Sequence, residues 1–132
     1  MPVIELRAGP MHATLRPDLG ASVAGLWLNA VPVLRSTDAQ TLTSARASGC
    51  FPLVPYSNRI GQRRFTWQGQ NHSLGANAGA DNPHAMHGSA WVSEWQTVHA
   101  DEHSALLRYV QPADASPDTH WPFAFECDQH FS

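Results

Sequence analysis

Apolar and polar residues alternate along short stretches of the chain, and turn-forming residues separate these stretches. In the first quarter of the chain the alternating stretches are residues 3–8, 11–16, 21–28 and 31–35. Gly9-Pro10 and Pro17–Gly20 supply turns between the first three of them. The pattern therefore predicts an antiparallel meander of strands.

The alternation returns in the second half of the chain. Arg64–Trp67 and His72–Leu74 flank Gln68–Asn71, which predicts a hairpin with a glycine-containing turn. Further strands are expected over residues 91–99, 105–110 and 121–131, the last with Phe123, Phe125, Cys127, Gln129 and Phe131 on one face. Twelve-residue stretches with helical periodicity are missing, so we expect an all-β fold, an antiparallel β-sandwich or barrel.

The remaining stretches read as loops. Residues 36–48 have weak periodicity and predict a loop with a short helical turn. Residues 49–60 contain Pro52 and Pro55, which cannot donate to a strand ladder, so an extended edge or an ordered loop is expected there. Residues 1–132 are expected to form one domain, or the N-terminal portion of a larger β-sandwich, because the chain stops at Ser132 in the middle of a predicted strand.

Composition excludes several classes of protein. The net charge is −3 and the eight basic residues are scattered arginines, so nucleic acid is not an expected partner. We find neither a signal peptide nor an apolar run that could span a membrane, which predicts a cytoplasmic protein without a membrane partner. Cys50 and Cys127 form no CxxC pair and are expected to be two buried free thiols rather than a disulfide.

Two segments carry the candidate chemistry. Asn58-Arg59 follows the proline-rich stretch, and its guanidinium could bind hydroxyls or a carboxylate, or could pair with a structural acid. His84 and His87 are three residues apart, but Pro83 and Gly88 disfavour the helix that a metal pair would need, so no metal is expected. A neutral histidine there suits hydroxyl binding or proton transfer.

Trp91 and Trp95 are four residues apart and would share one face of a strand. Core packing explains such a pair without any ligand. Stacking against the apolar face of a sugar ring is the functional alternative.

At these residues the sequence resembles the aldose 1-epimerase (galactose mutarotase) family. Residues 49–60 resemble the family's G-x-F-P-L-x-P-Y-x-N-R-I stretch, and residues 82–88 with Trp91 and Trp95 resemble its L-H-G…W…W signature. Three less specific matches lie in the same order at residues 17–21, 64–69 and 121–125. The resemblance implies a galactose mutarotase-like supersandwich, of which this chain would be an incomplete N-terminal part, and a reaction that uses no cofactor.

The resemblance also implies a function, the interconversion of the α and β anomers of an aldose by acid/base ring opening. Arg59 resembles the family's sugar-binding arginine and His87 its first active-site histidine, while Asn58 is expected to order the loop and Trp91 to contact the sugar. The family's general acid, a histidine, and its general base, a glutamate, belong to segments beyond the 121–125 strand entry. We therefore expect both beyond the end of this chain and assign no catalytic residue within it.

Two alternatives remain open from the sequence. Without the acid and the base, the same scaffold could serve as a non-catalytic carbohydrate-binding module. The chain could also be an assembly fragment that self-associates through unpaired strand edges. The sequence does not identify the aldose.

Overall fold

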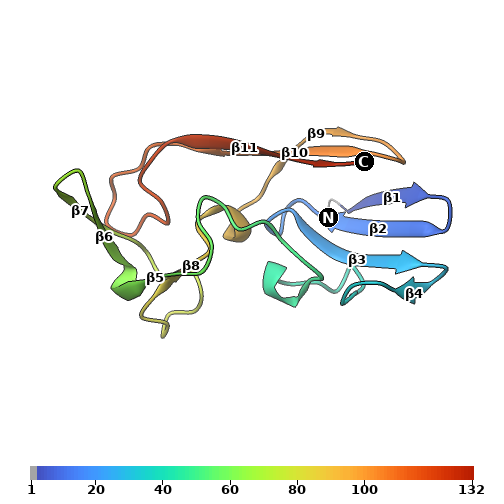
Figure 1. Cartoon of the computed structure of the whole chain (residues 1–132), viewed down its shortest axis with the longest axis horizontal. Helices are drawn as coiled ribbons and strands as arrows, with labels where there is room; N and C mark the ends of the chain where they lie inside the picture. Colours follow the sequence, from blue (N-terminus) through green and yellow to red (C-terminus); the bar gives the residue numbers. More distant parts are fainter. Residues whose placement is uncertain (1–2) are drawn as a thin grey trace. The chain divides into compact units, whose positions relative to one another are not determined.

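The computed structural model describes residues 3–132 and is an all-β structure of antiparallel sheets (Figure 1). Its first sheet is the predicted meander, with the four strands in chain order. These strands are β1 (Ile4–Ala8), β2 (Met11–Arg16), β3 (Ser22–Leu28) and β4 (Val31–Pro32). The last of them is shorter than the alternation predicted.

The second sheet is three-stranded, in the order β11-β10-β9. Its strands are β9 (Gln96–Ala100), β10 (Ala105–Gln111) and β11 (Phe125–Phe131). Along β11 the residues alternate between half-buried and exposed, so Phe125, Cys127, Gln129 and Phe131 share one face as predicted, whereas Phe123 precedes the strand and is exposed.

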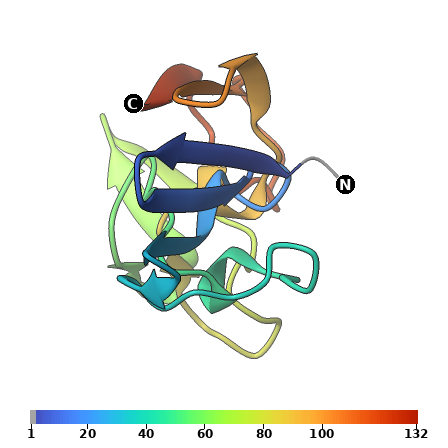
Figure 2. The same cartoon turned by 90° about the vertical axis from the view of Figure 1, so that its right-hand side faces the viewer.

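Side chains from both sheets meet in one apolar cluster. Leu6, Leu15 and Val23 of the first sheet and Ala105 of β10 are its buried members. Phe131 of β11 packs against them, and Figure 2 shows β9–β11 in orange and red beside the blue strands. Burial of these side chains supplies the main favourable free energy for holding the layers together. The predicted β-sandwich is thereby confirmed.

The strand predicted over residues 91–99 is wrong at its start. Residues Ala90–Val92 form the 3₁₀ turn η3, and β9 begins only at Gln96. Between η3 and β9, the backbone of Ser93 and Trp95 is hydrogen-bonded to the turn at residues 17–20 instead of to a neighbouring strand. Gly20 N donates to Ser93 O at 3.0 Å, and Trp95 N donates to Pro17 O at 2.9 Å. Similarly, the final strand begins at Phe125 rather than at residue 121.

Short elements complete the structure. The predicted hairpin is present as β6 (Arg64–Trp67) and β7 (Gln70–Ser73), and the expected helical turn is η1 (Ala45–Ala47). A two-strand ladder pairs β5 (Arg59–Ile60) with β8 (Ala85–Met86), and η2 (Gly61–Arg63) follows β5.

The chain divides into two compact units. One consists of the chain up to Pro52 together with Trp91–Tyr109 and Cys127–Ser132, and the other of Leu53–Ala90 and Val110–Glu126. The boundary therefore passes through β10 and β11. Asn58, Arg59 and His87 belong to the second unit, and Trp91 belongs to the first.

Both cysteines are thiols, as expected, but neither is buried: Cys50 is exposed and Cys127 is half-buried. Cys50 precedes the proline-rich stretch and makes a single bridge to Val23 instead of entering a strand. Within residues 3–132 no helix is long and apolar enough to cross a bilayer.

Candidate functional site

The proline-rich segment leads directly to the candidate arginine. Pro52 and Pro55 lack an N–H donor, so the backbone cannot join a sheet there, and the Val54–Pro55 peptide bond is cis. The segment ends at Asn58, whose φ of 69° lies in the left-handed region that asparagine tolerates better than most residues. The chain then enters β5 at Arg59.

Antiparallel pairing of β5 with β8 brings the two predicted segments together. Arg59 lies opposite Met86 and Ile60 lies opposite Ala85. Beyond the end of this ladder Asn58 and His87 make a reciprocal contact. Asn58 N donates to His87 Nδ1 at 2.8 Å, and His87 N donates to Asn58 O at 2.9 Å.

The first of these bonds determines the tautomer of the neutral His87 ring. A ring nitrogen that accepts an N–H bond carries no proton, so the proton of the neutral imidazole is on Nε2. In this tautomer Nε2 of His87 is a hydrogen-bond donor, the kind of group that binds an oxygen acceptor.

Arg59 keeps its charge available. The residue is exposed, and its guanidinium makes no ion pair with any acid in the described chain, residues 3–132. A guanidinium is always charged near neutral pH and presents planar N–H donors. Such a group can bind the oxygen atoms of a polyhydroxylated or anionic ligand.

Gly88 brings the histidine segment close to the proline-rich segment. Its φ is 80°, and a Cβ at this position would overlap the carbonyl oxygen of Val54. Two residues later Ala90 N donates to Val54 O at 3.1 Å. Burial raises the pKa of the Tyr56 phenol, and the backbone of Gly88 beside it opposes that rise.

The ring of His84, at the other end of the ladder, is held like the ring of His87 by a backbone N–H group. Gln62 N donates to His84 Nδ1 at 3.0 Å, and His84 N donates to Asn82 Oδ1 at 2.9 Å. Both histidines thus use Nδ1 as an acceptor for a backbone N–H. Nowhere in the described part of the chain do three His, Cys, Asp or Glu side chains gather as metal ligands would.

Asn77 belongs to this site and was not predicted. Its side-chain amide bonds the backbone of Met86 and of Gly88, the residues on either side of His87. It lies in a stretch of small and turn-forming residues that reads only as a loop, so the sequence pattern gives no signal for it.

Trp91 lies in the other compact unit, and its environment is apolar. It is 5% exposed and stacks on Phe51, with ring centroids 5.6 Å apart. Trp95 is also buried and packs against Tyr109. Within their unit both rings serve in packing.

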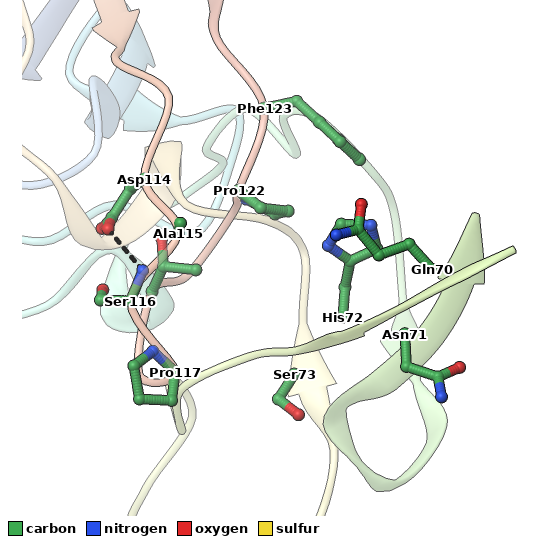
Figure 3. Close-up of a pocket in the computed structure, with 11 residues that line it drawn as sticks. Gln70, Asn71, His72, Ser73, Asp114, Ala115, Ser116, Pro117, Pro122 and Phe123 are labelled. Atoms are coloured by element: carbon green, nitrogen blue, oxygen red, sulfur yellow. Dashed lines mark hydrogen bonds between the residues drawn. The ribbon is translucent and has the colours of Figure 1, made fainter. Parts of the chain in front are cut away.

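A separate cavity of about 380 Å³ lies between β7 and the loop that precedes β11 (Figure 3). Its lining includes neither Asn58, Arg59 nor His87. Asp114 accepts a hydrogen bond from Ser116 N at 2.9 Å, which holds the pKa of that carboxyl below its usual range. His72 is stacked on Phe65 at 5.0 Å. With the carboxylate and the ring engaged in this way, we assign the cavity no chemistry.

The structure thus defines a class of protein: an antiparallel β-sandwich with a two-strand ladder that contains an exposed arginine, Arg59, and ends at an ordered histidine, His87. The family model described as aldose 1-epimerase matches residues 2–132, and the chain belongs to this family.

Individual proteins are also similar to this chain. The uncharacterized protein YphB of Escherichia coli (strain K12) is 37% identical over 101 residues, which cover 74% of this chain and 34% of that protein. A crystal structure of an Escherichia coli K12 protein proposed to be an aldose 1-epimerase superposes with a TM-score of 0.81 at 28% identity, covering 98% of this chain and 40% of that one. A GalM/aldose epimerase homologue from C. elegans shares the fold, with a TM-score of 0.75 at 20% identity over 98% of this chain and 41% of its own. The chain thus spans about two fifths, or less, of the length of these relatives.

Proposed function

We propose that the complete protein is an isomerase that interconverts the α and β anomers of an aldose, and that Arg59 and His87 bind the sugar. The observation that carries this proposal is the reciprocal contact between Asn58 and His87, which orients the His87 ring at the end of the ladder that contains Arg59. Membership of the aldose 1-epimerase family supports the reaction class.

The reaction needs a sugar held still while two protons move. A base takes the proton of the anomeric hydroxyl and an acid protonates the ring oxygen, so the ring opens. After rotation about C1–C2 it closes on the other face. Hydrogen bonds from the Arg59 guanidinium and from His87 Nε2 would fix the sugar for both transfers.

Proton transfer is assigned to groups outside residues 1–132. The relatives are much longer than this chain, and the family resemblance implies a histidine acid and a glutamate base in their later segments. Asn58 then has a supporting role, because its backbone orients His87. The cytoplasmic location and the lack of nucleic-acid or membrane partners stay predictions.

Polarimetry tests this function. Freshly dissolved α-D-glucose or α-D-galactose is followed as its rotation approaches equilibrium, with and without the complete protein. Faster equilibration supports the proposal. An unchanged rate across the common aldoses would contradict it, and calorimetric binding of a sugar without anomer exchange would instead favour a carbohydrate-binding module.

A further inference from the structure

We propose that Asn77 is the positioning residue of His87: its side-chain amide fixes the backbone on both sides of the histidine and so keeps His87 Nδ1 against Asn58 N. The part of this inference that concerns turnover rests on the proposed function. The part that concerns the geometry of His87 does not.

Three hydrogen bonds carry the inference. Asn77 Nδ2 donates to Met86 O at 2.6 Å and to Gly88 O at 2.8 Å. Met86 N donates to Asn77 Oδ1 at 2.9 Å. One side chain therefore binds the residue before His87 twice and the residue after it once.

Only a short primary amide can make this set. It combines two N–H donors on one nitrogen with a carbonyl acceptor, whereas a carboxylate has acceptors only and would face two carbonyl oxygens. Glutamine carries the same groups one methylene further out. The three hydrogen bonds thus require both the amide group of Asn77 and the short length of its side chain.

The chain that carries Asn77 is itself fixed. Leu74 is buried, and its N–H donates to Arg63 O at 2.8 Å. Gly75 N donates to Thr119 O at 2.8 Å, and a Cβ on Gly75 would overlap the Asp118 carbonyl oxygen, so the backbone approach there is as close as glycine permits. The amide is presented from an anchored loop.

His87 needs such support, because its backbone is in an unfavourable conformation. Its φ is 59°, in the left-handed region that costs a residue with a Cβ conformational energy. The hydrogen bonds of Asn77 to Met86 and Gly88 hold the backbone on both sides of the histidine. The ring can then stay on Asn58 N.

The deciding experiment is the nearly isosteric substitution Asn77→Asp in the complete protein, read by long-range ¹H–¹⁵N NMR of the histidine rings without sugar. His84 is an internal reference, because its Nδ1 accepts from Gln62 N and not from a group that Asn77 holds. Asn71→Asp is the matched control. Oδ1 of Asn71 accepts a hydrogen bond from Thr66 Oγ1 at 2.7 Å, and a carboxylate at this position can still accept it.

We expect the wild type and the Asn71→Asp variant to show both rings with the proton on Nε2. Asn77→Asp should leave His84 unchanged and give His87 the averaged signal of two exchanging tautomers. Two results would overturn the inference: an unchanged His87 signal, or the loss of the pattern at both histidines, since Asn77 would then support the whole loop. If Asn77→Asp does not fold, Asn77→Ala removes the same bonds without a charge, and the same outcomes decide.

Sugar turnover gives a second readout. A misplaced His87 should lower kcat/KM about tenfold to a hundredfold in Asn77→Asp, against a change below about twofold in Asn71→Asp. If neither Asn77→Asp nor the wild type turns over any aldose while His87 still loses its tautomer, the proposed function fails and the positioning role stands.

Discussion

Arg59 and His87 are held by the structure in different ways. His87 is fixed through its ring, its own N–H and both neighbouring residues. Arg59 is fixed only at its backbone, in the ladder with Met86, and its side chain is exposed. Substitution of Arg59 should therefore affect ligand binding and leave folding nearly unchanged.

Removal of the Arg59 side chain provides the residue-scale prediction. In the complete protein Arg59→Ala should lower kcat/KM for the aldose at least about tenfold, which corresponds to about 1.4 kcal/mol of transition-state stabilisation. The melting temperature should stay close to that of the wild type. Polarimetry and a thermal melt measure the two quantities.

Arg46→Ala is the control for this prediction. Arg46 is likewise exposed, but it lies in η1 of the other compact unit. It should change neither quantity. Equal turnover by Arg59→Ala and Arg46→Ala would remove the sugar-binding role of Arg59.

At this scale the sequence could predict only part of the site. Asn58, Arg59 and His87 stand in segments whose residue order is distinctive, and the structure brings these three together. Asn77 could not be predicted, because its partners are backbone groups of Met86 and Gly88 that any sequence would possess. A side chain that binds peptide groups leaves no pattern of residue types at the other end of the contact.

Among the elements, a buried arginine joins β2 to the loop at residues 37–42. Arg16 donates through Nη1 to the carbonyl oxygens of Ala39 and Leu42. Its other nitrogens bind both carboxylate oxygens of Asp18 at 2.7 Å. The Arg16 side chain is 5% exposed and that of Asp18 is 24% exposed, so solvent screens the pair only weakly.

Asp18→Asn should reveal this contact through its pH dependence. The hydrogen bond and charge of Arg16 lower the pKa of Asp18, so the stabilisation is present above the pKa of an unfolded aspartate, about 4, and is lost as pH falls through the lower folded value. At pH 7 the variant should lose about 2 kcal/mol of unfolding free energy, and the difference should shrink in acid.

Urea unfolding at several pH values measures this difference. The exposed Asp81→Asn is the matched control and should have little effect at any pH, since Asp81 makes no hydrogen bond with another described residue. A loss in Asp18→Asn that stays constant down to strongly acid pH would contradict the role of the charge.

The β6–β7 hairpin offers a second test at this scale. Its two-residue turn places Gln68 at φ 49° and Gly69 at φ 74°, and such turns favour Asn-Gly. Gln68→Asn should raise stability by about 0.5 kcal/mol, and Gly69→Ala should lower it by about 1 kcal/mol. Thermal melts measure both changes. A Gly69→Ala variant as stable as the wild type would contradict the left-handed turn.

Strands were predicted well where the residues that alternate between apolar and polar also pair with a neighbouring strand. They were predicted poorly where the backbone of such residues bonds a turn instead. β2 occupies the predicted residues 11–16, because its backbone there also pairs with a strand on each side, β1 and β3. Residues 91–95 alternate equally well, but their backbone binds Pro17 and Gly20. Alternation reports which side chains can share a face, and it does not report which partner the peptide groups take.

At the scale of the whole molecule, these 132 residues are much shorter than the relatives that they match. The chain covers 40% of the Escherichia coli structure that it matches. β9, with all five residues exposed, and β4 each pair with one strand in the described chain, and Val31 and Val98 are exposed on them. Unpaired strand edges with apolar side chains favour association.

We therefore predict that residues 1–132, prepared alone, do not accelerate mutarotation and associate as their concentration rises, whereas the complete protein accelerates it. The physical reason lies in the roles proposed above: Arg59 and His87 bind the sugar, and groups outside residues 1–132 transfer the protons. Polarimetry at matched molar concentration measures the first property, and gel filtration over a concentration series measures the second. Mutarotation by residues 1–132 alone would place the acid and the base within them, and a monomer of 14.4 kDa at every concentration would contradict association through the strand edges.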